Sequence, residues 1–212
     1  MQKSDKEAGQ FFIRMIDQPT NLLRAGKVSR RWNTVSRDHR LWKHIEYADK
    51  QRRPLRHLKS LLKSRGGART KSFTLKGAGF SHPLKMSLTR ALTIEIGQIC
   101  QFLTHLTFSE CCFPEEVNLH LLITSNRDLV YLSICRCHFK AKTFFHNLHT
   151  IKRTSLSHLK LSGLTLSQSN IIALKPLFSS LTWLSASGFS GPGNLTNARK
   201  ITKTQNEIVF HF

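Results

Sequence analysis

The chain has 212 residues, a length that fits one domain with a small appendage or a single solenoid. Its composition, 40% hydrophobic and 21% charged, is sufficient for a sizeable core and excludes disorder as the default state. No stretch approaches the roughly 18 apolar residues that a membrane span needs. The formal net charge of +21 predicts attraction to acidic protein surfaces or to nucleic acid.

The N-terminal third carries the larger part of this charge. Residues 1–71 hold 19 Lys or Arg against 6 acidic residues, a net of +13, and the remaining residues contribute +8. The first residues are charged and lack the apolar segment of a signal peptide, and the five cysteines are an odd number. We therefore expect reduced thiols and a cytoplasmic or nuclear protein.

Residues 1–48 have the apolar spacing of a small helical module. Four apolar residues predict one face of a short first helix: Phe11, Phe12, Met15 and Ile16. A break follows, and Pro19 is tolerated in the first turn of a second helix. Beyond it, five residues are expected to share one apolar surface across a turn at Gly26: Leu22, Leu23, Ala25, Val28 and Trp32.

This region resembles the second and third helices of an F-box. That family has a leucine pair, a Val-Cys or Val-Ser step, a Trp four residues after the Val, and a Leu-Trp pair about nine residues later. The matching residues are Leu22, Leu23, Val28, Ser29, Trp32, Leu41 and Trp42. The resemblance implies docking to the Skp-type adaptor of a cullin–RING ubiquitin ligase, with contacts from Leu22, Leu23, Val28 and Trp32. The family's Leu-Pro pair is absent here, which leaves open a module without adaptor binding.

Residues 42–190 contain an internal repeat with the strand template Leu-x-x-Leu-x-Leu-x-x-Cys-x-Leu, the signature of leucine-rich repeats. Three copies fill it well: Leu103, Leu106, Phe108, Cys111 and Phe113; Leu129, Leu132, Ile134, Cys137 and Phe139; Leu156, Leu159, Leu161, Leu164 and Leu166. Weaker copies begin at Trp42, Thr70 and Leu181. The six starts are 25 to 33 residues apart, in or just above the usual period of about 20–29 residues.

An amphipathic stretch follows several of these strands. The predicted helix faces are Leu55, Leu58, Leu61 and Leu62; Phe144, Phe145, Leu148 and Ile151; Ile171, Ile172, Leu174 and Phe178. Strand, turn and helix in each repeat predict an α/β leucine-rich-repeat solenoid, a horseshoe with a parallel concave sheet and outer helices, preceded by the F-box-like module. Residues 191–212 depart from the template and are expected to form a divergent cap or tail, or the end of a truncated array.

The polar positions of the strands are expected on the concave side. The third template position gives His44, Ser72, His105, Tyr131, His158 and Trp183, and the fifth gives Glu46, Thr74, Thr107, Ser133, Lys160 and Ser185. Rings in successive strands of a rigid sheet are the anchors that protein interfaces favour. We therefore predict a client-binding surface at His105, Tyr131, His158 and Trp183. The alternative is that rings simply suit half-exposed strand positions.

Signs of catalysis or metal binding are weak. Strand alternation places Cys135 on the concave face and Cys137 in the core, so the two cannot share an ion. His146 and His149 lack a third ligand nearby and are expected at the surface. The sequence has no zinc-protease, nucleophile-elbow or phosphate-loop motif. We expect no catalysis, no metal site and no cofactor.

The preferred hypothesis is a substrate-recognition subunit of an SCF-type cullin–RING E3 ubiquitin ligase, as the resemblance implies. The F-box would dock the Skp-type adaptor, and the repeats would hold an unidentified client protein for ubiquitin-dependent degradation. One alternative is a leucine-rich-repeat scaffold without adaptor binding. Another is a weak nucleic-acid binder that uses the basic residues between 50 and 71, namely Lys50, Arg52, Arg53, Arg56, Lys59, Lys63, Arg65 and Arg69.

Overall fold

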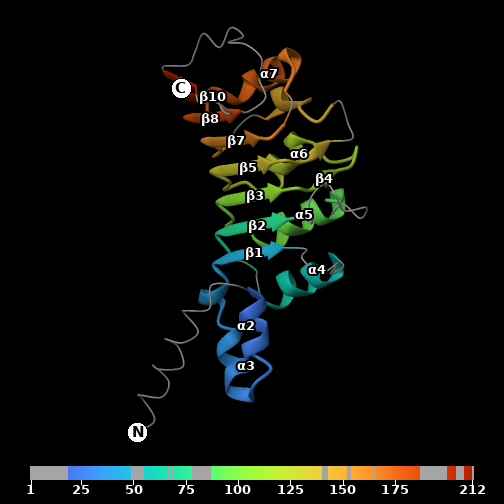
Figure 1. The fold of residues 1–212 in the computed structure, drawn as a ribbon, viewed down its shortest axis with the longest axis vertical. Coiled ribbons are helices and arrows are strands. Elements are labelled where there is room, and N and C mark those ends of the chain that lie inside the picture. Colours follow the sequence, from blue (N-terminus) through green and yellow to red (C-terminus); the bar gives the residue numbers. More distant parts are fainter. Residues whose placement is uncertain are drawn as a thin grey trace.

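In the computed structural model, the chain is an α/β protein in which one long sheet carries a helical module at one end (Figure 1). The structure describes residues 19–48, 55–65, 67, 69–77, 87–139, 143–151, 154–164, 166–186, 200–203 and 208–211. The residues predicted as a first helix, Phe11 to Ile16, lie outside these ranges. No helix in the described ranges is long and apolar enough to cross a membrane.

The helical module consists of α2 (Pro19–Ala25), α3 (Arg30–Ser36) and the 3₁₀ turn η1 (His39–Trp42). The Ser29 side chain caps α3 by accepting a 3.2 Å hydrogen bond from the backbone N–H of Trp32. A Cβ on Gly26 would lie only 2.6 Å from Ser36 Oγ, so glycine permits the close approach of α2 and α3. The predicted turn at Gly26 is thus confirmed, and it fixes the packing of the hairpin.

The sheet has eight strands in the order β1-β2-β3-β5-β7-β8-β10-β9. Its first six strands are parallel: β1 (His44–Ala48), β2 (Ser72–Lys76), β3 (His105–Ser109), β5 (Tyr131–Cys135), β7 (His158–Ser162) and β8 (Trp183–Ala186). In register, His44 pairs with Ser72, Ser72 with His105, and so on through Tyr131 and His158 to Trp183. The register predicted from the repeat is confirmed along all six strands.

Alternation of side chains along each strand separates two faces of the sheet. One face packs into a single apolar core, to which the strands contribute Ile45, Phe73, Leu75, Leu106, Phe108, Leu132, Ile134, Leu159, Leu161 and Leu184. We call the opposite side the polar face, defined by the third and fifth template positions from His44 to Ser185. Because a one-residue slip would exchange the two sets, burial of the first set strongly specifies the register.

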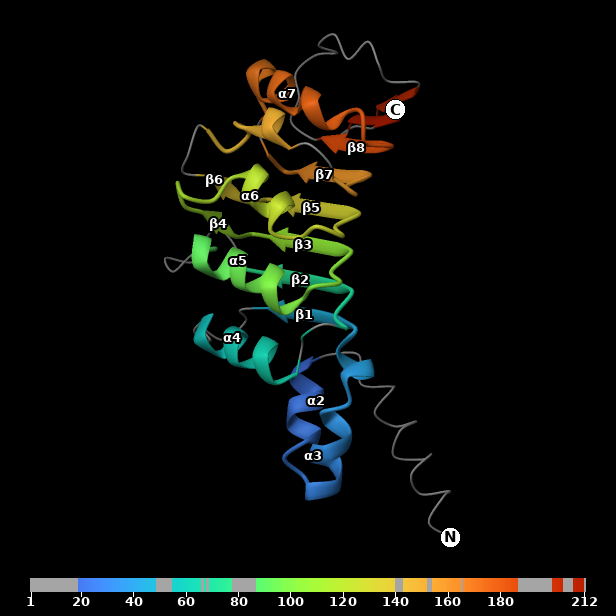
Figure 2. The ribbon, with the colours of Figure 1, turned by 180° about the vertical axis from the view of Figure 1, so that it is seen from behind.

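An outer layer of short helices covers the apolar side of the sheet (Figure 2). It contains α4 (Leu55–Ser64), α5 (Arg90–Ile99), α6 (Leu119–Thr124), η2 (Leu148–Thr150), α7 (Gln168–Leu174) and η3 (Lys175–Leu177). Leu58, Leu61 and Leu62 of α4 are buried as predicted. The face predicted for residues 144–151 is buried at Phe144, Phe145 and Leu148, but its backbone forms turns and the 3₁₀ helix η2.

Two details of the outer layer differ from expectation. Ile172 is 51% exposed, whereas Ile171 and Leu174 of the same helix are buried. The helix therefore turns Ile172 to its outer side, and the predicted four-residue apolar face is wrong at this position. The helices α5 and α6 were not predicted, because their apolar residues continue directly into those of the following strands.

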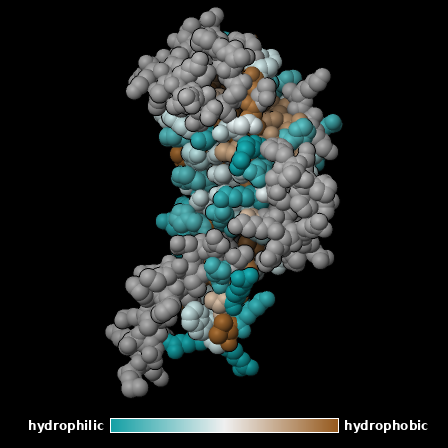
Figure 3. All heavy atoms as spheres, viewed as in Figure 1, coloured by the Kyte–Doolittle hydropathy of each residue, from teal (hydrophilic) through white to brown (hydrophobic). Residues whose placement is uncertain are grey.

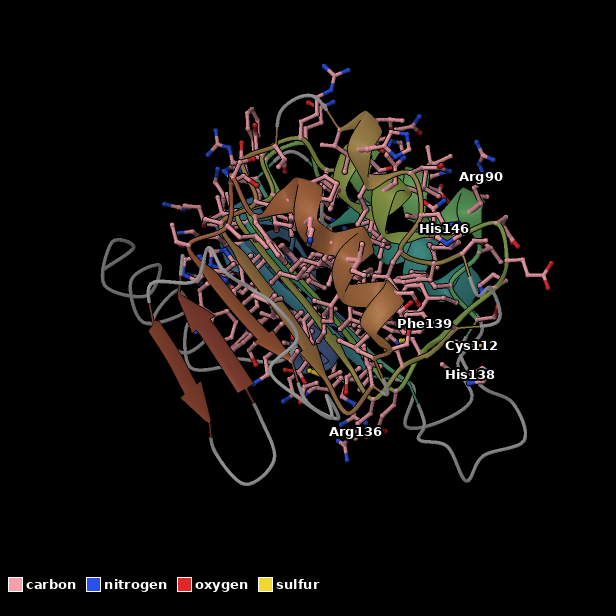
Figure 4. The ribbon with its side chains drawn as sticks, turned by 90° about the horizontal axis from the view of Figure 1, so that it is seen from above. Arg90, Cys112, Arg136, His138, Phe139 and His146 are labelled. Carbon is pink, nitrogen blue, oxygen red and sulfur yellow. The ribbon has the colours of Figure 1, made fainter. Side chains whose placement is uncertain are left out.

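Three of the parallel strands, β3, β5 and β7, end in a repeated tight turn. Glu110, Arg136 and Gly163 follow the last residues of β3, β5 and β7, and all three have positive φ values of 57°, 47° and 65°. The N–H groups of Glu110 and Arg136 continue the sheet, donating to the Cys135 carbonyl at 2.9 Å and to the Ser162 carbonyl at 2.7 Å. After the turns, β4 (Cys112–Phe113) and β6 (His138–Phe139) pair as a second small sheet. Figure 4 shows Cys112, His138 and Phe139 grouped on one side of the molecule.

The C-terminal segment adds an antiparallel hairpin to the sheet. β10 (Ile208–His211) pairs with β8, and β9 (Lys200–Lys203) pairs with β10. β10 therefore takes the place beside β8 that a further parallel repeat would occupy. Both strands belong to residues 191–212, the predicted divergent cap or tail, and the other residues of that segment lie outside the described ranges.

Candidate protein-binding surfaces

The four predicted client-binding rings form one continuous row on the polar face. The ring centroids of His105 and Tyr131 are 5.7 Å apart, those of Tyr131 and His158 are 6.4 Å apart, and those of His158 and Trp183 are 6.0 Å apart. The planes are inclined by 25° to 36°, so each ring lies obliquely over the next. These spacings are within the favourable range of about 4.5–7 Å for ring pairs. We call this set the ring row.

The ring row is accessible from outside. His105 is exposed, and Tyr131, His158 and Trp183 are half-buried. Beside it, at the fifth template position, β3, β5 and β8 carry the small residues Thr107, Ser133 and Ser185, and β7 carries Lys160. Ser133 and Ser185 are buried, with exposed fractions of 3% and 0%. An accessible row of rings on a rigid sheet is suited to holding an extended segment or a helix of a partner.

Both histidines of the ring row are held by the residue that precedes them. Thr104 Oγ1 lies 2.9 Å from His105 Nδ1, and Ser157 Oγ lies 2.8 Å from His158 Nδ1. The Thr104 hydroxyl also donates to the Lys71 carbonyl at 3.0 Å, which uses its single proton. His105 Nδ1 must therefore donate to Thr104, so the neutral ring keeps its acceptor lone pair at Nε2. The sheet thus presents an oriented hydrogen-bonding group and not only a ring.

The four residues predicted to contact the adaptor differ in how much of each side chain is exposed. Val28 is 75% exposed, Leu23 and Trp32 are half-buried against the core, and Leu22 is 3% exposed. Helix α2 ends at Ala25, and Val28 lies in the following turn, where its N–H donates to the Ala25 carbonyl at 3.0 Å. The predicted shared apolar surface therefore needs correction: Leu22 faces the interior, and Val28 projects from the tip of the hairpin. In Figure 3, that end carries hydrophobic atoms bordered by hydrophilic ones.

Trp42 connects the helical module to the sheet. Its side chain is 1% exposed, and its indole N–H donates a 2.7 Å hydrogen bond to the backbone carbonyl of Ser36, the last residue of α3. On the other side, the Thr70 hydroxyl donates to the Trp42 carbonyl at 3.0 Å just before β2 begins. The module and the first two strands are consequently tied by buried hydrogen bonds.

The basic residues predicted as nucleic-acid contacts do not form one surface in the part of the chain that is described. Lys59 and Lys63 both pair with Glu95 of α5, at 2.9 and 3.0 Å. Hydrogen bonds from the side chains of Lys59 and Lys63 lower the pKa of Glu95, and the bond from Lys59 is the larger cause. Arg65 instead reaches the module, where its guanidinium donates to Ser36 Oγ at 3.2 Å. Lys50, Arg52, Arg53 and the Arg56 side chain lie outside the described parts.

A basic hollow of about 410 Å³, which was not predicted from the sequence, lies between the helical module and the sheet. It is lined by His39, Arg40, Lys43, Arg69, Lys71 and Phe102. These residues come from η1 and from the segments just before β1, β2 and β3. Because the repeat aligns those segments, a signal was present in the sequence: cationic residues recur immediately before the first two strands, at Lys43 and Lys71.

The cysteines behave as the repeat predicts. Cys111 and Cys137 are buried, and Cys135 is half-buried on the polar face beside Ser133 Oγ at 3.2 Å. The thiols of Cys111 and Cys137 are positioned to donate to the carbonyls of Ser109 and Cys135, both at 3.3 Å. The neighbouring Cys137 thiol, together with burial, raises the pKa of Cys111 well above its ordinary value. Both side chains are therefore part of the core, as predicted.

Comparison with known proteins identifies the helical module. Residues 14–47 match the F-box-like family, a range that includes α2, α3, η1 and most of β1. No curated protein matches the chain. F-box domains generally bind Skp-type adaptors in cullin–RING ligases. The match supports an F-box protein whose F-box-like domain, residues 14–47, is followed by an α/β region built on a parallel sheet.

Proposed function

We propose that this chain is the substrate-recognition subunit of an SCF-type cullin–RING ubiquitin ligase. Its F-box-like domain docks the Skp-type adaptor, and its repeats hold a client protein for ubiquitylation. The chain supplies proximity and orientation in the cytoplasm or nucleus, and the ligase partners carry the chemistry. The parallel sheet, with its period and its outer helices, supports a leucine-rich-repeat solenoid as the client-binding part.

The observation that carries the proposal is the joint at Trp42. This residue lies within the F-box-like match, yet its side chain is buried and bonded to the end of α3, while its carbonyl is bonded to the start of the second repeat. A receptor of this class must hold its client at a fixed position relative to the adaptor. A buried, hydrogen-bonded tryptophan at the boundary between the two functional parts supplies that rigidity.

Exposure indicates which residues contact the adaptor. Val28 offers an apolar side chain that is 75% exposed, and Leu23 and Trp32 retain partly accessible apolar surface. Leu22 supports these residues from the interior and is not proposed as a contact. When a partner covers a solvent-exposed valine at a hairpin tip, the free energy of the complex falls by about 25 cal/mol per Å² of apolar surface that is buried.

The proposal is tested by the affinity of the purified chain for a purified Skp-type adaptor, measured by titration calorimetry. The wild-type chain should bind saturably, and Val28→Asp should weaken binding by at least about tenfold, because a carboxylate would lose its hydration at the interface. The matched control is Ile172→Asp, which places the same charge at an exposed apolar position of the outer layer. The control should bind as the wild type does.

The client surface is tested by replacing Tyr131 and Trp183 with Ala together. Proteins that depend on the ring row should be recovered with the wild type and lost with this variant, as counted by quantitative mass spectrometry of the proteins captured by the tagged chain itself. The free energy of unfolding should change by no more than about 1 kcal/mol, because both side chains are only half-buried. The control pair, His149→Ala with Ile172→Ala, alters exposed outer-layer residues and should keep the same proteins.

A second candidate function is a leucine-rich-repeat scaffold that does not bind the adaptor. The absence of the family's Leu-Pro pair favours it. A folded wild-type chain that shows no adaptor binding, while ring-row clients are still captured, would replace the ligase proposal with this one.

A further inference from the structure

The basic hollow at the joint has positive charge that the described residues do not neutralise. Of its lining cations, Arg40 pairs with Asp38. Lys43, Arg69 and Lys71 have no carboxylate partner among the described residues. Like charges gathered in a concave site repel one another and focus a positive potential into the hollow. An anionic ligand would relieve this repulsion.

The hollow is built on rigid backbone. The Lys43 carbonyl accepts hydrogen bonds from the N–H groups of Lys71 and Ser72, at 2.8 and 3.1 Å. The Lys71 carbonyl in turn accepts from the N–H groups of Thr104 and His105, at 2.9 and 3.0 Å. This repeated bonding fixes the start of each strand, so the side chains of Lys43 and Lys71 project from a preorganised framework.

One wall of the hollow is apolar. Phe102 is 48% exposed, and the Lys71 ammonium lies 5.1 Å from the centre of its ring. The cation therefore occupies one face of the ring in a cation–π contact. Opposite, the Arg69 guanidinium and His39 Nε2 are in hydrogen-bonding contact at 2.5 Å, which connects the second repeat to η1. An anionic group and an apolar group can thus be accommodated side by side.

We propose that this hollow binds an acidic peptide segment, in which a carboxylate or phosphate side chain contacts Lys43, Arg69 and Lys71 while a neighbouring apolar side chain contacts Phe102. This proposal rests on the proposed function in one respect: the acidic segment is taken to be part of the client protein. Thr104, which bonds the Lys71 carbonyl, also holds His105 of the ring row. The hollow therefore lies close along the chain to the start of β3, the strand that carries His105 of the ring row.

A peptide fits the hollow better than nucleic acid does. On the neighbouring outer layer, Lys59 and Lys63 are engaged by Glu95, so these two lysines do not extend the hollow into a basic track. Phe102 is the one phenyl ring among the described residues that line the hollow. It offers a contact for a single apolar side chain but no series of rings on which successive bases could stack.

The test measures fluorescence anisotropy of labelled peptides with the full-length chain. Three probes share one backbone of alternating leucines: one with glutamates, one with phosphoserines and one with glutamines between them. Both anionic probes should bind, and the glutamine probe should not. Preference for glutamate or for phosphoserine then identifies the source of the anion. A labelled single-stranded oligothymidine serves as the nucleic-acid probe.

Two double variants with the same change in net charge separate the hollow from general electrostatics. Lys43→Ala with Lys71→Ala removes two cations from the hollow and should weaken the anionic probes by at least about tenfold. Lys59→Ala with Lys63→Ala removes two cations that Glu95 already engages and should change affinity by less than about twofold. Phe102→Ala should weaken the anionic probes by a smaller factor.

Three results would overturn the proposal: no binding of either anionic probe, equal losses in both double variants, or tighter binding of oligothymidine than of either peptide. Adaptor affinity is measured on the same preparations. If adaptor binding fails while the anionic probes bind and depend on Lys43 and Lys71, the ligase proposal is wrong and the hollow remains an acidic-peptide site. Melting temperatures confirm that each variant is folded.

Discussion

The indole N–H of Trp42 donates a 2.7 Å hydrogen bond to the carbonyl of Ser36, and this contact joins the last turn of α3 to the segment that leads into the sheet. The Ser36 carbonyl lies at a helix end, where it has no partner within the helix. Because Trp42 is 1% exposed, water does not compensate for the loss of this bond. The bond therefore contributes to stability as well as to orientation.

We predict that Trp42→Phe destabilises the protein by about 2–4 kcal/mol, because it leaves a buried carbonyl unpaired and a cavity beside it. Trp183→Phe is the matched control; its ring is half-buried in the ring row, and we expect a loss of less than about 1 kcal/mol. Urea unfolding, followed by circular dichroism, measures both. Equal losses of unfolding free energy in the two variants would mean that the hydrogen bond from Trp42 contributes no more to stability than the half-buried Trp183 ring does.

Gly97 provides a test in which local propensity and tertiary packing disagree. It lies inside α5, where replacing glycine by alanine ordinarily stabilises a helix by about 1 kcal/mol. A Cβ at this position would lie 1.9 Å from the Ser125 carbonyl oxygen, which belongs to the backbone at the end of α6. We therefore expect Gly97→Ala to destabilise by about 1–3 kcal/mol. Gln98→Ala, at the exposed neighbouring position, should lie within about 0.5 kcal/mol of the wild type, and a stabilising Gly97→Ala would contradict the packing of α5 on α6.

Thiol labelling checks the burial of the cysteines. Among the five, Cys135 is half-buried, and Cys100, Cys111, Cys112 and Cys137 are buried. Burial also raises the pKa of Cys100, which further disfavours its reactive thiolate. We expect iodoacetamide to modify Cys135 first in the native protein and the other four only after unfolding. Peptide mass spectrometry over a time course identifies the order, and early modification of Cys111 or Cys137 would place them outside the core.

The ion pair between Asp38 and Arg40 predicts a specific pH dependence. The hydrogen bond from the Arg40 side chain lowers the pKa of Asp38 from 3.8 to about 2. Since the folded-state pKa lies below the ordinary value, the pair's stabilisation is present above about pH 4 and is lost as the pH falls toward 2. Carbon-13 NMR titration of the Asp38 carboxyl should show a midpoint near 2 in the wild type.

Arg40→Gln should return that midpoint toward 3.8, because it removes the charged donor. The Arg40 side chain is 64% exposed, so solvent screens its ion pair with Asp38 and the effect of the pair on overall stability is small. Arg37→Gln is the control, since Arg37 bonds Asn33 and not Asp38. An unchanged midpoint in Arg40→Gln would mean that another group sets the pKa.

Several features could be predicted from the sequence because they depend on local periodicity. The alternation of Leu132, Ser133 and Ile134 specifies a strand, and its recurrence at Leu159 and Leu161 specifies the register of the neighbouring strand. The ring row follows from that register, since one template position in adjacent parallel strands must form one line. The F-box-like module could also be predicted from the spacing of its residues, because Val28, Trp32 and Trp42 lie within one short segment.

Other features depend on which segments meet, and periodicity does not contain that information. Leu22 and Val28 are both apolar residues near one turn, yet the sheet and the neighbouring helix bury the first and leave the second at 75% exposure. Lys63 and Arg65 are near neighbours in the sequence, but one contacts Glu95 and the other Ser36. Charge alone does not distinguish a neutralised lysine from an available one.

The sequence by itself determined the F-box-like module, the repeated strands, their register and the buried cysteines, because helix and strand periods place side chains on faces independently of distant contacts. Only the tertiary structure decided the role of Trp42 at the joint, the exposure of Val28 and the assembly of the basic hollow from η1 and the starts of three strands. These features arise where segments distant in the sequence pack together, and their energies depend on burial and partners that a one-dimensional pattern does not specify.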